Sequence, residues 1–392
     1  MGEIAEKVTK KNSNLEISET FTNSAEQGII SQKDFFDHKV ASSENIGNYY
    51  VVDKNDFVYN PRISTTAPVG PINRNRLGRA GVMSPLYTVF RAKDINQLFL
   101  EWYFKSSCWH LFMYFNGDSG ARSDRFSIKD SVFFSMPIFV PSKEEQFKIG
   151  RFFDQLNETI TLQQRKLNSL QKLKKGLLQK MFPKNGENIP EIRFPEFSDA
   201  WKQRELGEIA ERVTRRNSSL ESQTPLTISA EYGLIDQNKF FGKRIAAKDL
   251  SNYYLIQKGE FAYNKSTSND APWGAIKRLD CYNNGALSTL YIVFKIKDNK
   301  SCYSDFLVTY YGTSLWHKGV KEIATEGARN HGLLNVSPSD FFRTKLVIPQ
   351  DFEEQRKIGA FFTQLDNTIT LQQRKLESLQ KLKKGLLQQM FI

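Results

Sequence analysis

Basic, hydroxyl and amide side chains occur at matching places in the two halves of this 392-residue chain. Such side chains contact phosphate oxygens, and they form hydrogen bonds with base edges when a loop carries them into a groove. The chemistry that they could perform is therefore recognition of a nucleic acid. For any one of them an ordinary solvated surface is the alternative, because arginine and lysine are mostly exposed. The candidate contacts are Arg62, Ser64, Thr65, Arg74, Arg76, Arg79, Arg122, Arg125, Arg215, Arg216, Lys265, Ser266, Thr267, Asn269, Lys277, Arg278, Arg329, Asn330 and His331.

These candidates belong to three pairs of polar stretches that we expect to form loops. KKNSN near the start corresponds to RRNSS in the second half. NPRISTTAPVGPINRNRLGR corresponds to NKSTSNDAPWGAIKRLD, and GARSDR corresponds to GARNHG. The paired positions predict two DNA-facing surfaces built on one plan.

Signatures of catalysis are not found in the sequence. There is no GxxxxGKS/T phosphate loop, no GxGxxG after a strand, and no Asn-Pro-Pro-aromatic tetrad of amino methyltransferases. Cys108, Cys281 and Cys302 show no paired spacing, which argues against both a disulfide framework and a zinc site. Missing motifs do not exclude an enzyme, but no residue pattern here indicates one.

The charge balance points to a polyanionic partner. The formal net charge is +12 and the isoelectric point is about 9.3, which favours nucleic acid, although a merely soluble basic protein would show the same balance. No apolar run approaches the length of a membrane span, and the N-terminus does not resemble a signal peptide. We expect a cytoplasmic protein without a membrane partner.

Two long stretches of the chain have nearly the same sequence. TITLQQRKLNSLQKLKKGLLQKMF ends at Phe182 and TITLQQRKLESLQKLKKGLLQQMF ends at Phe391. The opening MGEIAEKVTKKNSNLE likewise returns as LGEIAERVTRRNSSLE from Leu206 to Glu221. The chain is therefore predicted to contain two copies of one unit, each a globular segment followed by a long helix.

Each globular segment reads as a mixed α+β domain. NYYLIQKGEFAYN and STLYIVFKIK alternate as strands do, whereas DFLVTYYGTSLWHKGV has a helical pattern. SVFFSMPIFVP and DFFRTKLVIP each predict a final strand that stops at a proline, Pro141 or Pro349. The predicted fold class is α+β, with two mixed α/β domains that are each followed by a long helix.

The repeated helices are predicted to need a partner. Ser142 with Glu145, and Asp351 with Glu354, have the spacing of a capping box at their starts. A helix of this length would extend about 55–60 Å, and its apolar stripe is too long for one small domain to cover. We predict an antiparallel coiled coil with pseudo-two-fold symmetry; the alternative is that each helix packs on its own domain. The stripe consists of Ile149, Phe153, Leu156, Ile160, Leu167, Leu170, Leu173, Leu177 and Met181.

These patterns divide the chain into five parts. Two target-reading domains, 1–141 and 201–349, are each followed by a helix, 142–182 and 350–392, and a connector rich in Pro, Gly and Asn spans 183–200. The first copy opens at Met1, where the second has Leu206, so we expect either a trimmed start or an arrangement that is incomplete at that end. Similar helices with dissimilar basic domains would hold two different readers for an asymmetric, two-part DNA site.

The arrangement resembles the specificity (S) subunit of type I restriction-modification systems over essentially the whole chain. The motifs that carry the resemblance are the WKQRELGEIAERVT-type opening, FxYN at 57–60 and 261–264, GAR, the VPSKEEQ and IPQDFEEQ helix starts, and LQKLKKGLL. The resemblance implies two target recognition domains, each reading half of a bipartite site in double-stranded DNA, joined by two conserved helices.

The resemblance also implies partners and a division of labour. The chain itself would have no catalytic activity, cofactor or metal. Two modification subunits would use S-adenosylmethionine to methylate adenine, and restriction subunits would translocate and cut DNA. The helices, with their starts at 144–146 and 353–355, would bind the modification subunits. A stand-alone DNA-binding regulator, and a coiled-coil scaffold with incidental charge, are the alternatives.

Overall fold

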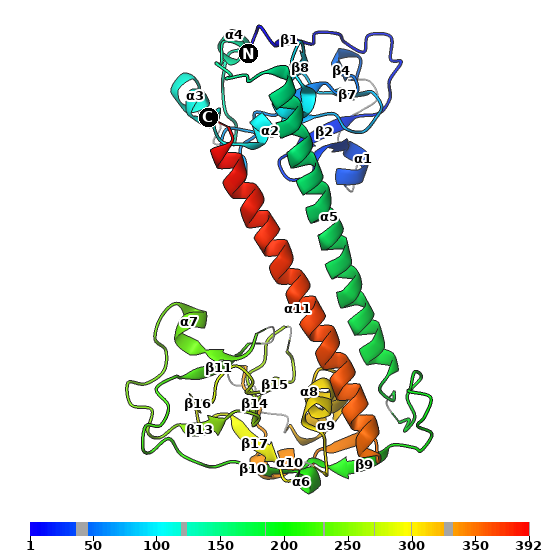
Figure 1. The fold of residues 1–392 in the computed structure, drawn as a ribbon, viewed down its shortest axis with the longest axis vertical. Helices are drawn as coiled ribbons and strands as arrows, with labels where there is room; N and C mark the ends of the chain where they lie inside the picture. The colour runs from blue at the N-terminus through cyan, green and yellow to red at the C-terminus, as the bar shows by residue number, and fades with distance from the viewer. Residues whose placement is uncertain are drawn as a thin grey trace. The chain divides into compact units, whose positions relative to one another are not determined.

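The computed structural model describes residues 1–36, 46–118, 124–184, 186–229, 232–269, 271–298, 300–324 and 332–391. The chain divides into two compact units: unit 1 contains Met1–Arg165 and Gln373–Ile392, and unit 2 contains Lys166–Gln372. Each unit therefore combines one globular domain with parts of both long helices (Figure 1).

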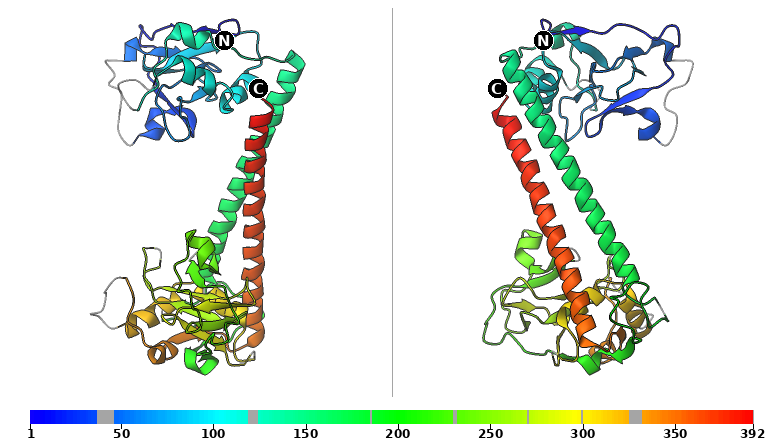
Figure 2. Two further views of the ribbon diagram at one scale, coloured as in Figure 1. Left: turned by 90° about the vertical axis from the view of Figure 1, so that its left-hand side faces the viewer. Right: turned by 45° about the vertical axis from the view of Figure 1, so that its right-hand side comes forward.

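The two long helices, α5 (Lys143–Lys180) and α11 (Phe352–Gln389), have 38 residues each. In unit 1 the first half of α5 lies beside the last half of α11, where Lys383 Nζ donates to Asn157 Oδ1 at 2.6 Å (Figure 2). In unit 2 the end of α5 lies beside the start of α11, where Lys174 pairs with Asp366. The predicted antiparallel pairing of the helices is confirmed.

The sheet of unit 1 has four antiparallel strands in the order β1-β8-β5-β6. Two further ribbons, β2–β3 and β4–β7, belong to the same unit, and buried residues of its helices share one core with residues of the sheet. The elements are β1 (Ala5–Lys7), β2 (Phe21–Ser24), β3 (Gly28–Ser31), α1 (Gln32–Phe35), η1 (Ile46–Asn48), β4 (Tyr50–Val52), β5 (Phe57–Tyr59), β6 (Ile72–Arg74), β7 (Gly81–Met83), β8 (Thr88–Ala92), α2 (Gln97–Lys105), α3 (His110–Asn116) and α4 (Asp130–Phe134).

Unit 2 repeats this plan with the strand order β10-β17-β14-β15 and ribbons β11–β12 and β13–β16. It adds a ribbon of β9 with β18, which joins the connector to the end of the domain. The elements are β9 (Lys202–Glu205), α6 (Leu206–Ile209), β10 (Ala210–Arg212), β11 (Leu226–Ser229), β12 (Gly233–Asp236), α7 (Gln237–Phe241), β13 (Tyr254–Gln257), β14 (Phe261–Asn264), β15 (Ala275–Arg278), β16 (Asn284–Leu287), β17 (Ile292–Ile296), α8 (Ser304–Tyr311), α9 (Leu315–Ile323), α10 (Pro338–Phe342) and β18 (Lys345–Ile348).

The predicted final strand is confirmed in unit 2 and wrong in unit 1. β18 lies where it was expected, but residues 130–134 form helix α4 and residues 137–141 carry no strand. A strand needs a neighbour for its hydrogen bonds. The partner of β18 is β9, and no strand pairs with residues 137–141 in the part of the chain that the structure describes.

The helix starts follow the predicted cap only in part. Ser142 Oγ accepts from the Glu145 amide at 3.3 Å, as an N-cap does. In the second copy Asp351 accepts from the Glu353 amide at 2.7 Å, but Glu354 does not complete a capping box. Its carboxylate is instead buried against Arg193, 2.6 Å away.

A glutamine and a glycine that occur in both copies dock each long helix on its own domain. Gln146 and Gln355 are buried, and each accepts a backbone N–H from the loop before α2 or α8 at 2.9 Å. Gly150 and Gly359 lie where those helices begin; a Cβ would stand 2.7 Å from Leu98 Cβ in the first case. In each copy the glutamine and the glycine therefore have a structural role and are not available to a partner.

The far end of each long helix is buried in the core of the other domain. Phe182, which follows α5, lies 5.8 Å from Phe306 between ring centroids, and Phe391, which follows α11, lies 5.6 Å from Phe99. Both phenylalanines are almost fully buried. Most of the predicted apolar stripe also packs inward, but Leu173 is 52 % exposed, so that member of the stripe was wrong.

The buried helix end predicts a large stability effect. Replacing Phe391 with alanine should destabilise the chain by about 3–5 kcal/mol, because it leaves a cavity in an aromatic core. Urea unfolding followed by circular dichroism measures the change. Leu382→Ala on the same helix, at a 51 % exposed position, is the control and should change little; equal effects of the two variants would contradict the packing described here.

Candidate nucleic-acid interface

Two of the predicted loop stretches meet in unit 1. The Ile63 amide donates to the Asp124 carbonyl at 3.0 Å, and the Phe126 amide donates to the Pro61 carbonyl at 2.7 Å. This short antiparallel bridge sets Arg62 opposite Arg125. The Arg62 side chain is 66 % exposed, and its guanidinium lies 3.6 Å from the Asp124 carboxylate. The bridge therefore presents two arginines on one loop surface.

Ser64 and Thr65 lie at the tip of the same loop, and both are exposed. Ser64 forms a tight turn in which its Oγ accepts from the Ala67 amide at 3.1 Å. Its hydroxyl is also 3.2 Å from that of Thr66. The tip therefore offers small hydroxyl groups next to the arginine pair.

Unit 2 builds the same loop pair from different residues. The Leu334 amide donates to the Lys265 carbonyl at 2.9 Å, and the Thr267 hydroxyl donates to the Gly332 carbonyl at 3.0 Å. Ser266 pairs with Leu333 in the bridge. Burial and the nearby Arg212 lower the pKa of Lys265. Asn269 is exposed in this loop.

The FxYN motif explains why both loops have one shape. The Tyr59 hydroxyl donates to the Val69 carbonyl at 2.9 Å, and Tyr263 makes the same bond to Trp273, so each tyrosine ties the far end of its loop to the sheet. Burial raises the pKa of both tyrosines. The following asparagine caps the start of the loop, as Asn60 Oδ1 accepts from the Arg62 amide at 3.0 Å.

A glycine closes each loop. Gly70 and Gly274 have φ values of +83° and +78°, and a Cβ on either would stand 2.1 Å from the carbonyl oxygen of Asn60 or Asn264. Only glycine accepts this conformation and this approach. The framework of each loop is therefore held by sheet residues, while the residues at the tip differ between the units.

The predicted arginines that follow the loop in unit 1 lie elsewhere and are already paired. Arg74 is 11 % exposed and its Nε lies 2.7 Å from Glu101. Arg76 contacts both Glu101 at 2.8 Å and Asp154 of α5 at 2.6 Å. Arg79 pairs with Glu19 at 2.7 Å. These three side chains join parts of unit 1 to one another, and their placement favours a structural role.

The equivalent residues of unit 2 behave similarly. Arg278 is 17 % exposed and contacts Asp280 and Asp305, both at 2.7 Å. Lys277 is half-buried, and its pKa is lowered by burial and by the nearby Lys174. Neither side chain joins the loop pair described above.

The two arginines in the opening stretch of unit 2 have different surroundings. Arg215 contacts Glu260, a buried carboxylate, at 2.8 Å. Arg216 is exposed and lies over the Tyr254 ring, 4.8 Å from its centroid. Arg216 therefore stays a candidate contact, whereas Arg215 stabilises the domain. Four further predicted contacts, Arg122, Arg329, Asn330 and His331, lie outside the described residues.

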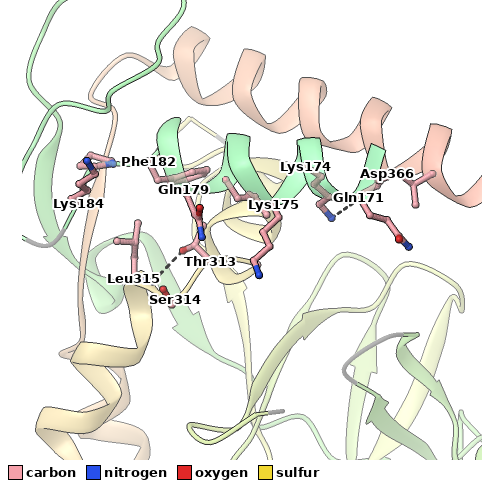
Figure 3. A pocket seen from close by; sticks show the side chains of 14 residues that line it. Gln171, Lys174, Lys175, Gln179, Phe182, Lys184, Thr313, Ser314, Leu315 and Asp366 are labelled. Atoms are coloured by element: carbon pink, nitrogen blue, oxygen red, sulfur yellow. Dashed lines mark hydrogen bonds and ion pairs between the residues drawn. The ribbon is translucent and has the colours of Figure 1, made fainter. Parts of the chain in front are cut away.

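The sequence analysis missed a hollow that recurs in both units. In unit 2 a cavity of about 850 Å³ lies between the end of α5 and the α8–α9 turn, with Lys175, Thr313 and Ser314 in its wall (Figure 3). In unit 1 a cavity of about 240 Å³ is lined by the matching Lys384, Ser106 and Ser107. Thr313 donates its hydroxyl to the Tyr310 carbonyl at 2.7 Å and Ser106 donates its hydroxyl to the Tyr103 carbonyl at 2.6 Å, so the lysine is the group in each cavity that suits a phosphate. The sequence analysis did not select Lys175 and Lys384, because in the sequence they look like residues on the solvated face of a helix.

The chain matches the family described as Type I restriction modification DNA specificity domain over residues 1–172 and 198–381. These two segments cover most of the chain and correspond to its two repeats. The chain therefore belongs to this family.

Solved structures support the fold. The type I restriction-modification S subunit from M. genitalium is 15 % identical with a TM-score of 0.56, and the match covers 100 % of this chain and 94 % of that one. A chain from a study of complex assembly and conformational transition of the type I R-M system is 14 % identical with a TM-score of 0.52, covering 98 % and 95 %. No helix within the described ranges is long and apolar enough to cross a membrane.

Arg62 and Arg74 provide a matched pair of tests. Arg62→Ala should weaken DNA binding by the assembled complex and leave stability unchanged. A base-edge contact would cost about 1–3 kcal/mol at one base pair, while a phosphate contact would weaken all sequences alike and lower the salt dependence. Competition binding at several salt concentrations separates these cases.

Arg74→Ala should instead destabilise unit 1 by about 1–3 kcal/mol, because Glu101 loses one buried partner. Thermal unfolding measures this loss. A stable Arg74→Ala protein with altered DNA-sequence preference would contradict this structural role and make Arg74 a candidate DNA contact.

Proposed function

We propose that this chain is the non-catalytic specificity subunit of a type I restriction-modification complex and reads an asymmetric, bipartite DNA site. The observation that carries the proposal is the loop pair built twice on one framework with different residues at its tip. Arg62 and Arg125 form the bridge pair in unit 1, whereas Ser266 and Leu333 form the corresponding pair in unit 2. Two readers of one shape and unlike chemistry suit two unlike half-sites.

The cavities beside Lys175 and Lys384 support a second set of DNA contacts. In this proposal Lys175 and Lys384 bind DNA phosphates and position the duplex, while the loop tips read the bases. The basic net charge of +12 supplies a favourable field for both. His331, Asn330, Arg329 and Arg122 belong to the same loop regions in the sequence and remain candidate base or phosphate contacts.

The proposed partners are two modification subunits and restriction subunits in the cytoplasm. S-adenosylmethionine would bind to the modification subunits, which would methylate adenine. Leucines at repeated positions leave the long helices open to such partners: Leu162 and Leu371 are 61 % and 65 % exposed, and Leu173 and Leu382 are 52 % and 51 % exposed. Exposed apolar side chains among the polar residues of these helix faces favour protein contacts there.

Exchange of one reader tests the proposal. Replacing residues 201–349 with the matching segment of a related protein should change one half of the recognised site and leave the other half as it was, because each unit has its own core and loop pair. Mapping of methylated adenines in cells that carry the hybrid and its modification subunit measures the result. The reciprocal exchange of residues 1–141 is the control; a change in both halves would contradict independent reading.

The purified chain alone should transfer no methyl group from S-adenosylmethionine to DNA, and adding the modification subunit should produce the activity. A radiolabel transfer assay checks this. Tight, site-specific binding by the chain alone, unaltered by any modification subunit, would favour a stand-alone regulator instead.

A further inference from the structure

Two lysines line one cavity of unit 1 without a carboxylate partner. The cavity has a volume of about 320 Å³ and lies between α2, α5 and α11, with Lys105, Lys383, Trp102 and Asn157 in its wall. Lys383 Nζ donates to Asn157 Oδ1 at 2.6 Å and lies 4.7 Å from the centroid of the Trp102 ring. Lys105 donates to Asn73 Oδ1. Within the described ranges neither lysine forms an ion pair, so both are held by uncharged groups.

The carboxylates beside this cavity are held by arginines. Glu101 lies in the cavity wall and contacts Arg74 at 2.7 Å and Arg76 at 2.8 Å. Asp154 of α5 contacts Arg76 at 2.6 Å. The charges of these arginines and carboxylates balance one another. The two lysines therefore add positive charge that this group of side chains does not compensate.

The surroundings of the two lysines disfavour their positive charge. Lys105 is exposed to the cavity, but protein surrounds it on its other sides, and this desolvation lowers its pKa; Glu101 opposes the effect and Arg76 adds to it. Burial and the neighbouring Lys105 lower the pKa of Lys383. An anion between two ammonium groups favours the charged form of both. The pair of lysines is therefore suited to a negatively charged ligand.

Unit 2 has a carboxylate at the matching place. In the aligned helices, Lys174 of α5 corresponds to Lys383 of α11, and Asp366 of α11 corresponds to Asn157 of α5. Lys174 and Asp366 form an ion pair (Figure 3), whereas Lys383 bonds to an amide. The charge of the helix lysine is thus neutralised by the chain itself in unit 2 but not in unit 1.

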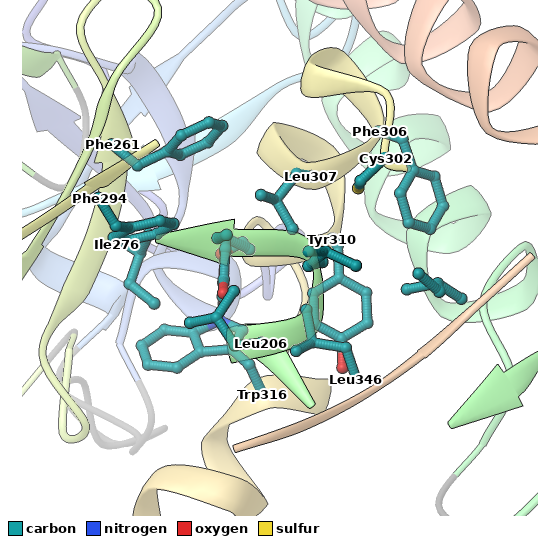
Figure 4. Packing of buried hydrophobic residues seen from close by; sticks show 14 of the residues in the cluster. Leu206, Phe261, Ile276, Phe294, Cys302, Phe306, Leu307, Tyr310, Trp316 and Leu346 are labelled. Carbon is teal, nitrogen blue, oxygen red and sulfur yellow. Dashed lines mark hydrogen bonds between the residues drawn. The ribbon is translucent and has the colours of Figure 1, made fainter. Parts of the chain in front are cut away.

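The second lysine comes from a different element in each unit. Helix α8 is held in the core of unit 2 by aromatic and leucine side chains (Figure 4). Gly312, directly after α8, stands at the position of Lys105, the last residue of α2. Lys277 of β15 stands instead at the position of Asn73 of β6, and burial and the nearby Lys174 lower its pKa. Because different sequence positions bring an amine close to the helix lysine, duplication alone does not explain the pairing of two amines.

We propose that the cavity of unit 1 binds a small phosphate-bearing molecule through Lys105 and Lys383. A doubly charged phosphate group would balance the two ammonium groups. Each ammonium has three donors and uses one on an asparagine, so two donors on each remain for ligand oxygens. The volume of about 320 Å³ is about ten times the roughly 30 Å³ of one water molecule. The cavity therefore has room for a phosphate group and a small organic part.

A free small molecule is favoured over the backbone of a nucleic acid, because protein surrounds Lys105 on the sides away from the cavity. A bound phosphate would link the end of α2 to α11 and should stabilise unit 1. The inference goes beyond the proposed DNA-reading function and does not depend on it.

Inorganic phosphate is the probe, and isothermal titration calorimetry with the full chain at constant ionic strength measures its binding. The titration should be saturable, and phosphate should raise the midpoint of thermal unfolding, since a ligand that binds the native state stabilises it. Lys105→Met should weaken binding about tenfold or more, because it removes one of the two ammonium groups. Lys381→Met, which removes an exposed charge on α11, is the matched control and should bind as the unchanged chain does.

The repeat supplies a second pair of variants. Asn157→Asp gives unit 1 the carboxylate of unit 2, so it should abolish phosphate binding and raise the unfolding midpoint in phosphate-free buffer. Gln155→Glu adds a carboxylate at an exposed position of the same helix and should bind phosphate as the unchanged chain does. Asn157→Asp keeps the size of the side chain, so it decides the question even if Lys105→Met unfolds.

Absence of saturable binding would overturn the proposal, as would equal binding by Lys105→Met and Lys381→Met or by Asn157→Asp and Gln155→Glu. Weaker binding of duplex DNA by Lys105→Met, without any binding of phosphate to the unchanged chain, would assign the lysines to the DNA backbone and contradict a free ligand.

Discussion

The burial of each long helix's last residues in the core of the other repeat is the contact on which this structure depends. Phe182 completes the core of unit 2 and Phe391 completes the core of unit 1. Neither globular domain therefore has a full core by itself. Because both helices must reach a second core, their length and antiparallel direction follow from the same requirement, and the strong similarity of the two helices reflects two equivalent tasks.

The candidate interface illustrates how a fixed framework carries variable chemistry. The tyrosine and the asparagine hold the two ends of the loop through side-chain hydrogen bonds to backbone groups, and the glycine permits the close approach of those ends. Substitutions at the tip then change the donors and acceptors without disturbing the sheet. One framework can therefore carry different side chains at its tip, as the bridge pairs Arg62–Arg125 and Ser266–Leu333 of the two units show.

Positive charge in the sequence did not by itself distinguish structural arginines from candidate DNA contacts. Arg74, Arg76, Arg79, Arg215 and Arg278 are held by carboxylates of their own unit, so much of the positive charge in the polar stretches serves to tie elements together. The more exposed candidates are Arg62 on the paired loops, with its nearest carboxylate 3.6 Å away, and Arg216 on the opening stretch of unit 2. In the sequence, an arginine that pairs with a carboxylate looks the same as one that is exposed. Only the residues that lie next to it in the folded chain distinguish the two.

Much of the architecture was available from the sequence. The internal repeat, the mixed domains and the two long helices follow from local patterns and from comparison of the chain with itself, because periodicity and repetition are properties of the chain alone. Tertiary structure decided the rest. Glu354 has the spacing of a capping residue but is buried under Arg193, and SVFFSMPIFVP has the composition of a strand but pairs with no strand among the described residues. Caps, strands and free arginines all depend on which distant residue arrives beside them, and that is determined only when the chain packs.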